Sequence, residues 1–190
     1  RGAASAPDGY ILSLISTALV VGPHTTEGYP THDLFDAVCI LTLETRLIVT
    51  TWNSRFKTIG DVISFAKANP GKLTVGTDGF GTSAYMGLMA FSLATGTTYT
   101  HVPFAGVGPA VVAAAGGHLD LSLSSSSALA PFFDSKRMRP LVTFGRKRYD
   151  IYPNTPTAKE LGHDAEVQSF NGIGVPKDTS KDVDFAGANH

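Results

Sequence analysis

The chain has 190 residues, of which 43% are hydrophobic and 16% are charged, a composition typical of a folded globular protein rather than a disordered one. Its formal net charge of −1 offers no broad basic surface for nucleic acid. No apolar run approaches the roughly 20 residues that span a bilayer, and the single cysteine, Cys39, excludes an internal disulfide. We therefore expect no nucleic-acid partner and no membrane insertion.

The first part of the chain is predicted to be rich in strands. Strand-like runs occupy residues 10–14, 37–43 and 47–51, with a polar turn at 44–46 and a short helical stretch around Leu34. Apolar residues at helical spacing then predict a helix that is capped by Thr58 and ends near Asn69, because Pro70 disfavours helical geometry in the residue before it. We do not expect the part before this helix to close a domain alone.

From Leu73 onward, strand-like and helix-like segments alternate regularly. The strand-like runs are 73–77, 98–102, 119–123 and 141–144, and the helix-like segments between them are 82–94, 109–115 and 127–133. Alternation of this kind implies right-handed crossovers and a parallel sheet. The sequence therefore predicts an α/β fold with mostly parallel strands flanked by helices.

One strand-to-helix junction, Thr-Asp-Gly-Phe-Gly-Thr-Ser at residues 77–83, has the features of an anion site. Such a junction presents unpaired backbone N–H groups and the positive end of a helix dipole. It contains no lysine or arginine, and Ala84 stands where the G-x-G-x-x-G pattern needs its last glycine. The junction therefore favours a carboxylate over a nucleotide; a plain glycine-rich turn is the alternative.

Small, hydrogen-bonding residues follow three successive predicted strands, at 77–83, 104–108 and 124–127. Ligands bind at the carboxyl ends of strands in an open parallel sheet, so these ends can converge on one small anion. Simple connecting loops are the alternative. The candidate ligand-binding residues here are Thr77, Gly79, Phe80, Gly81, Thr82, Ser83, Phe104, Gly106, Ser124 and Ser125.

The sequence evidence for a catalytic site is weaker than that for a ligand-binding site. No G-x-S-x-G elbow is present, although a hydrolase or transferase that uses Ser83 or Ser125 with His101 stays an alternative. The six histidines show no close metal-ligand spacing. We predict a protein without catalytic activity, metal or cofactor.

Several motifs follow one another in a distinctive order: PDGY at 7–10, FKTIGDVI at 56–63, AKANPGKL at 66–73, GFGTS at 79–83, HVPF at 101–104, GGHLD at 116–120 and PTAKELG at 156–162. In this order the chain resembles the receptors of tripartite tricarboxylate transporters, also called the Bug family. The resemblance covers Pro7 to about Lys177.

The resemblance implies a periplasmic solute-binding protein with a two-lobe, periplasmic-binding-protein-like fold of type II. Such a receptor closes on a small carboxylate and delivers it to a membrane permease. It implies a partial first lobe at 1–49, a second lobe at 50–150 and a return to the first lobe at 151–190. The family's opening strand with its glycine-rich loop, and its C-terminal helices, have no counterpart in this sequence, so we expect the first lobe to be incomplete. Any export signal would lie outside the given sequence.

The resemblance also implies which residues bind the ligand. The loop at 79–83, with Phe104 to Gly106 and Ser124-Ser125, matches the second-lobe contacts, while Ser16 and Thr17 match a first-lobe segment and Asn171 lies where the family's cleft is.

Ala105 and Tyr85 replace residues that are often lysine and histidine in the family. Both replacements reduce the local positive charge, so we expect a ligand less charged than citrate, a mono- or dicarboxylate. We also expect one ligand per chain and a monomeric protein. The effector-binding domain of a transcriptional regulator, which can share the two-lobe plan, is a further alternative; an upstream helix-turn-helix would reveal it.

Overall fold

The computed structural model describes residues 2–25, 27–180 and 182. Contacts divide them into two compact units. Unit 1 comprises the described residues up to Leu43 and from Ser169 onward, and unit 2 is Glu44–Gln168. Strand β2 (Phe35–Thr51) begins in unit 1 and ends in unit 2.

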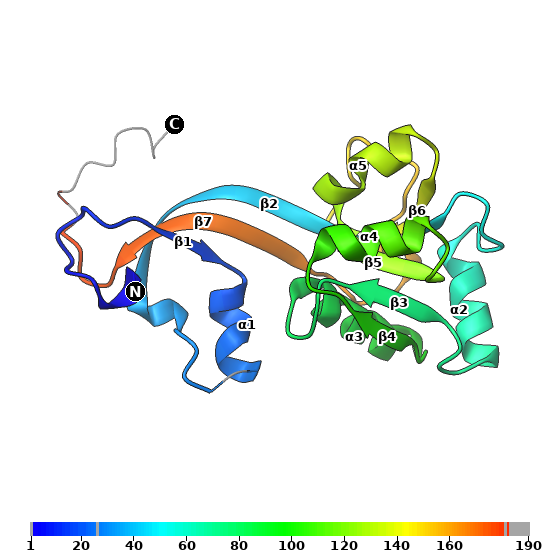
Figure 1. Cartoon of the computed structure of the whole chain (residues 1–190), viewed down its shortest axis with the longest axis horizontal. Coiled ribbons are helices and arrows are strands. Elements are labelled where there is room, and N and C mark those ends of the chain that lie inside the picture. The colour runs from blue at the N-terminus through cyan, green and yellow to red at the C-terminus, as the bar shows by residue number, and fades with distance from the viewer. Residues whose placement is uncertain (1, 26, 181, 183–190) are drawn as a thin grey trace. The chain divides into compact units, whose positions relative to one another are not determined.

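The sheet of unit 2 has the strand order β6–β2–β5–β3–β4 (Figure 1). The strands that follow β2 are β3 (Thr74–Thr77), β4 (Thr100–Pro103), β5 (Leu121–Ser125) and β6 (Met138–Thr143). Strand β3 is parallel to β4 and β5, whereas β2 is antiparallel to β5 and β6. The four later strands therefore run in one direction, as predicted, and their carboxyl ends share one edge.

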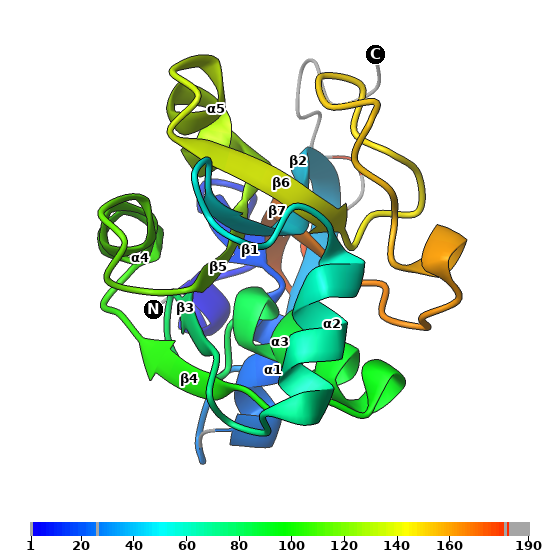
Figure 2. The same ribbon diagram turned by 90° about the vertical axis from the view of Figure 1, so that its right-hand side faces the viewer.

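Two pairs of helices cover the two faces of this sheet (Figures 1 and 2). They are α2 (Ile59–Ala68) with α3 (Ser83–Thr95), and α4 (Val107–Ala115) with α5 (Ser126–Asp134). Successive side chains of a strand point to opposite faces. Accordingly, Ile48 joins the core under α2 and α3, and Leu47 and Val49 join the core under α4 and α5. The part of β2 from Thr45 to Thr50 is thus buried on both faces.

The start of α2 follows the capping chemistry that the sequence predicts. Thr58 Oγ1 accepts a hydrogen bond from Asp61 N at 3.2 Å, and Asp61 Oδ2 accepts one from Thr58 N at 2.8 Å. This is a capping box for α2. Helix α3 ends at Gly96, whose φ of 64° is left-handed. The helices α3, α4 and α5 begin and end within two residues of their predicted ranges.

In unit 1, strand β1 (Ser13–Ser16) pairs antiparallel with β7 (Gln168–Pro176), and helix α1 (Ala18–Thr25) follows β1. A mostly apolar cavity of about 380 Å³ lies among these elements and the first part of β2. Cys39 lines this cavity and is half-buried. Short 3-10 helices are η1 (Gly2–Ala4), η2 (His32–Leu34) and, in unit 2, η3 (Lys159–Leu161).

The predicted turn at residues 44–46 is wrong, because β2 passes through it without interruption. The polar side chains there find partners in unit 2. Thr45 Oγ1 lies 3.0 Å from Thr143 Oγ1 on the neighbouring β6, and Arg46 bonds to Ser83. A polar run that is satisfied in this way can stay extended inside a sheet.

The prediction that unit 1 contains only a short helical stretch around Leu34 is also wrong. Helix α1 forms although Pro23 lies inside it, with Val20 N and Val21 N bonded to Thr17 O at 3.0 and 3.1 Å. The strand expected at 10–14 is found slightly later, at Ser13–Ser16.

The division between the units differs from the predicted boundaries at 49/50 and 150/151. Leu47 and Ile48 pair with β5 and β6, so the end of β2 belongs to unit 2. Ala158 and Ala165 are buried in the core under α2 and α3, which keeps the chain in unit 2 as far as Gln168.

None of the described helices is both long and apolar enough to cross a membrane. In the same part of the chain, no three metal-ligating side chains gather into a possible metal site.

Two leucines of α3 provide a matched test of this packing. Leu88 is fully buried, whereas Leu93 is 86% exposed. We predict that Leu88→Ala lowers the free energy of unfolding by about 2–5 kcal/mol, because it leaves a cavity. Leu93→Ala should change it by no more than about 0.5 kcal/mol. Chemical denaturation measures both, and equal losses would contradict the packing of α3 described here.

Candidate functional site

The loop at residues 77–83, here called the glycine loop, joins β3 to α3 and is held by its own hydroxyl groups. Thr77 Oγ1 accepts from Gly79 N at 3.3 Å, and Thr82 Oγ1 donates to Gly79 O at 2.9 Å. Gly79 and Gly81 have φ angles of 117° and 70°, which glycine adopts without strain. The loop therefore turns tightly enough to bring the end of β3 to the first turn of α3.

The first turn of α3 leaves backbone donors free. Thr82 caps the helix by accepting from Tyr85 N at 3.2 Å, and Met86 N donates to Thr82 O at 2.9 Å. The amides of Ser83 and Ala84 have no hydrogen-bond acceptor among the described residues. Together with the positive end of the helix dipole, these donors suit an anion.

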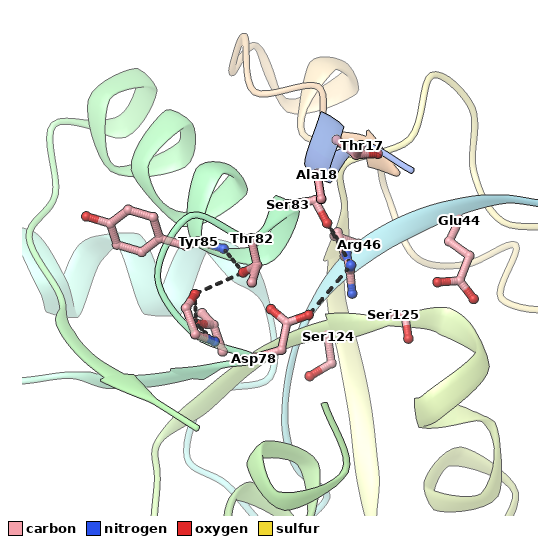
Figure 3. Close-up of polar contacts among 12 residues, drawn as sticks. Thr17, Ala18, Glu44, Arg46, Asp78, Thr82, Ser83, Tyr85, Ser124 and Ser125 are labelled. Atoms are coloured by element: carbon pink, nitrogen blue, oxygen red, sulfur yellow. Dashed lines mark hydrogen bonds and ion pairs between the residues drawn. The ribbon is translucent and has the colours of Figure 1, made fainter. Parts of the chain in front are cut away.

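Arg46 is a residue of the site that the sequence did not reveal. Its Nε and Nη2 donate to Ser83 Oγ at 2.9 and 2.6 Å, and Nη2 lies 3.7 Å from Asp78 Oδ2 (Figure 3). The residue is only 7% exposed. The sequence signal for a role of Arg46 was its position directly before the apolar run of β2. Sequence analysis assigned it instead to a polar turn at 44–46. A cation thus lies beside a glycine loop that itself contains no lysine or arginine.

The other predicted strand ends lie at the same edge of the sheet. Phe104 N donates to Thr77 O at 3.0 Å, which fixes the loop after β4 against the start of the glycine loop. Gly106 is the N-cap of α4, and Ser125, the N-cap of α5, lies opposite Arg46 in the pairing of β5 with β2. Ser124 Oγ lies 2.8 Å from Ser122 Oγ. The structure therefore brings the candidate residues of unit 2 to one edge.

An aromatic group flanks the glycine loop. The ring of His101 lies 4.8 Å from that of Phe80 and 4.9 Å from that of Tyr85, and its Nε2 is 2.7 Å from Thr77 Oγ1. Phe80 itself is 69% exposed. Burial lowers the pKa of His101 below its ordinary value, so the neutral ring is favoured. This cluster gives the edge of the site an apolar wall.

The polar contacts do not form a serine–histidine pair. In the described part of the chain, Ser83 Oγ bonds to Arg46, His101 bonds to Thr77, and Ser125 Oγ lies 3.3 Å from Ser127 Oγ. A general base would have to be hydrogen-bonded to the nucleophile. The arrangement therefore does not favour the hydrolase or transferase alternative.

The candidate residues of unit 1 also lie together. Ser16 is paired with Asn171 across β1 and β7. Thr17 Oγ1 accepts from Phe170 N at 3.0 Å, and Asn171 Nδ2 donates to Thr42 Oγ1 at 3.1 Å. Strand pairing thus assembles three residues that are far apart in the sequence.

An open sheet with helices on both faces and polar strand ends at one edge is an arrangement with which open α/β proteins bind ligands. A solute-binding protein from Polaromonas has the same fold, with a TM-score of 0.82 and 24% identity over 95% of this chain and 62% of its own. Rpa4515 of R. palustris, solved with adipate, gives a TM-score of 0.83 and 25% identity over 95% of this chain and 62% of its own.

The family model described as the tripartite tricarboxylate transporter family receptor matches residues 2–184. The chain belongs to this receptor family. A relative from Cupriavidus necator, called UPF0065 protein in gbd 5'region, is 33% identical over 94% of this chain and 55% of its own length. The chain spans about half the length of the curated relatives that it matches.

His101 makes stability depend on pH in a predictable direction. Because burial lowers its folded-state pKa, the unfolded chain binds more protons as the pH falls through about 6.5, and stability declines from there down to the folded-state pKa. We predict that His101→Gln loses less unfolding free energy than the wild type between pH 7 and pH 5.

Urea denaturation at several pH values measures this difference. His118→Gln, which alters an exposed histidine of the same unit, is the matched control. If the His101→Gln profile is as steep as that of the wild type, the histidine is not held neutral by the fold.

Proposed function

We propose that this chain is an extracytoplasmic, periplasmic receptor that captures a small mono- or dicarboxylate. The receptor then delivers the acid to the membrane permease of a tripartite tricarboxylate-type transporter. The observation that carries this proposal is the group of unpaired donors at the start of α3, reinforced by Arg46, in a chain of this receptor family. A carboxylate has two oxygens that accept several hydrogen bonds at once, so it matches such a set of donors.

In this proposal, unit 2 represents the second lobe and unit 1 represents the part of the first lobe that is present. The glycine loop, Phe104, Gly106, Ser124 and Ser125 contribute contacts from unit 2, and Ser16, Thr17 and Asn171 contribute contacts from unit 1. Membership of the family and the separate assembly of each group support this assignment.

The charge of the site and a similar solved structure support the proposed ligand class. The nearby cation, Arg46, is partly neutralised by Asp78 at 3.7 Å, which suits an acid of low charge better than a tricarboxylate. The aromatic wall of Phe80, Tyr85 and His101 would contact the apolar part of the acid. Adipate, the dicarboxylate in the structure of Rpa4515, has this combination of carboxylates and methylene groups.

Thermal unfolding against a panel of propionate, adipate, malate, citrate and benzoate tests the proposal. We predict that adipate or another acid of low charge raises the midpoint more than citrate does. A ligand at about 100 times its dissociation constant adds about 2.7 kcal/mol of stability, which corresponds to a shift of a few degrees.

Mass spectrometry of the recovered acid separates a receptor from an enzyme. A receptor returns the acid unchanged, whereas a converted acid would contradict the proposal. An unchanged midpoint across the whole panel would also contradict it.

A further inference from the structure

Arg46 places a cation in a buried position, where an unpaired charge is energetically costly. Its side chain is 9% exposed, and the next three residues of β2, Leu47 to Val49, are fully buried. Arginine is almost never buried unless it is paired. The carboxylate of Asp78 lies 3.7 Å away, and the closest contacts go to a neutral hydroxyl, that of Ser83.

The polar atoms around this arginine are not all satisfied. Arg46 Nη1, Asp78 Oδ1 and His101 Nδ1 are buried and have no hydrogen-bond partner among the described residues. All three belong to side chains that bond to, or are part of, the glycine loop. Native proteins leave few buried polar atoms unpaired. Two of these atoms, Arg46 Nη1 and Asp78 Oδ1, belong to one ion pair beside the glycine loop.

The contacts of Arg46 also determine what Ser83 can do. A hydroxyl has two acceptor lone pairs and one hydrogen to donate. Arg46 Nε and Nη2 both donate to Ser83 Oγ, so they occupy both lone pairs. The hydroxyl hydrogen has no acceptor in the described part of the chain. Ser83 is therefore restricted to donating, and it is the first residue of α3, where the free amides of Ser83 and Ala84 also lie.

We propose that Arg46 is a positioning residue for carboxylate recognition, which fixes the Ser83 hydroxyl as a donor to the ligand carboxylate. This inference rests on the proposed function. Without the guanidinium, the hydroxyl is free to rotate and to accept, and the positive charge beside the helix terminus is lost. The Asp78 carboxylate, 3.7 Å from Nη2, also holds the guanidinium in place.

Isothermal titration calorimetry of the purified protein tests this role, with adipate or whichever acid of the panel above binds most tightly. We expect Arg46→Met to weaken binding by about tenfold to a hundredfold, the usual effect of hydrogen bonds to a charged group. Arg46→Lys keeps the charge but not the forked donors. The affinity of Arg46→Lys should therefore lie between the affinities of Arg46→Met and the wild type.

Arg139→Met is the matched control. Arg139 lies on β6, the other neighbour of β2, opposite Thr50 and so toward the far edge of the sheet from Arg46. It donates to Trp52 O at 2.6 Å and stacks over the Trp52 ring, and within the described residues no hydrogen bond or ion pair joins it to the glycine loop. We expect its affinity to stay within about twofold of the wild type.

Loss of fold has to be separated from loss of recognition, because Arg46→Met leaves the Asp78 charge without a partner. In the double variant Arg46→Met with Asp78→Asn, no uncompensated charge remains, so we expect stability to recover while affinity stays low. Recovery of both stability and affinity would show that Arg46 is only structural and would overturn the proposal.

A double-mutant cycle tests whether Arg46 acts through Ser83. Arg46→Met should weaken binding much less in a Ser83→Ala background than in the wild type. Fully additive losses would overturn the positioning role.

The outcomes distinguish this inference from the function on which it rests. If the wild type binds and Arg46→Met binds as tightly as Arg139→Met, only the role of Arg46 is wrong. If the wild type binds no acid of the panel, the proposed function fails and the inference fails with it.

Discussion

The placement of Arg46 between β2 and the start of α3 is the constraint on which the candidate site depends. Taking a guanidinium out of water costs several kcal/mol, and its attraction to Asp78 at 3.7 Å, about 4 kcal/mol at an effective dielectric constant near 20, offsets only part of this. The two hydrogen bonds to Ser83 offset a further part. These bonds tie a strand inserted in the sheet to the helix whose amides form the candidate anion site.

Topology determines where this contact can form. Because β2 lies antiparallel between β5 and β6, its residues near Arg46 lie beside the carboxyl ends of the other strands. That is the edge where the glycine loop and the N-termini of the helices lie, and where open α/β sheets bind ligands. A cation on an inserted strand thus provides the charge that phosphate-binding loops usually carry within the loop itself.

The sequence predicted the elements whose signals are local. Thr58 and Asp61 mark the start of α2, Pro70 marks its end, and the alternation after Leu73 indicates four strands that run in one direction. The glycine loop could be recognised because glycines, hydroxyls and a helix start are adjacent in the chain. Each of these features depends on a few neighbouring residues, for which propensities and capping rules are informative.

The parts that sequence reasoning missed depend on contacts between distant residues. Nothing near Thr45 and Arg46 indicates that their partners, Thr143 and Ser83, would keep them in an extended strand. The insertion of β2 between β5 and β6 is likewise set by pairing across about 75 to 95 residues, which no local pattern encodes. Arg46 was missed for this reason, and the ligand roles of the candidate residues rest on family resemblance and on the free donors that the structure shows.

The most direct test of the central claim is a crystal structure of the protein grown with the acid that most raises its unfolding midpoint. The account predicts a carboxylate at the first turn of α3, with an oxygen about 2.7–3.2 Å from Ser83 Oγ or from the amides of Ser83 and Ala84, directly or through one water. An acid that is bound elsewhere, with no contact to residues 79–84, would contradict it.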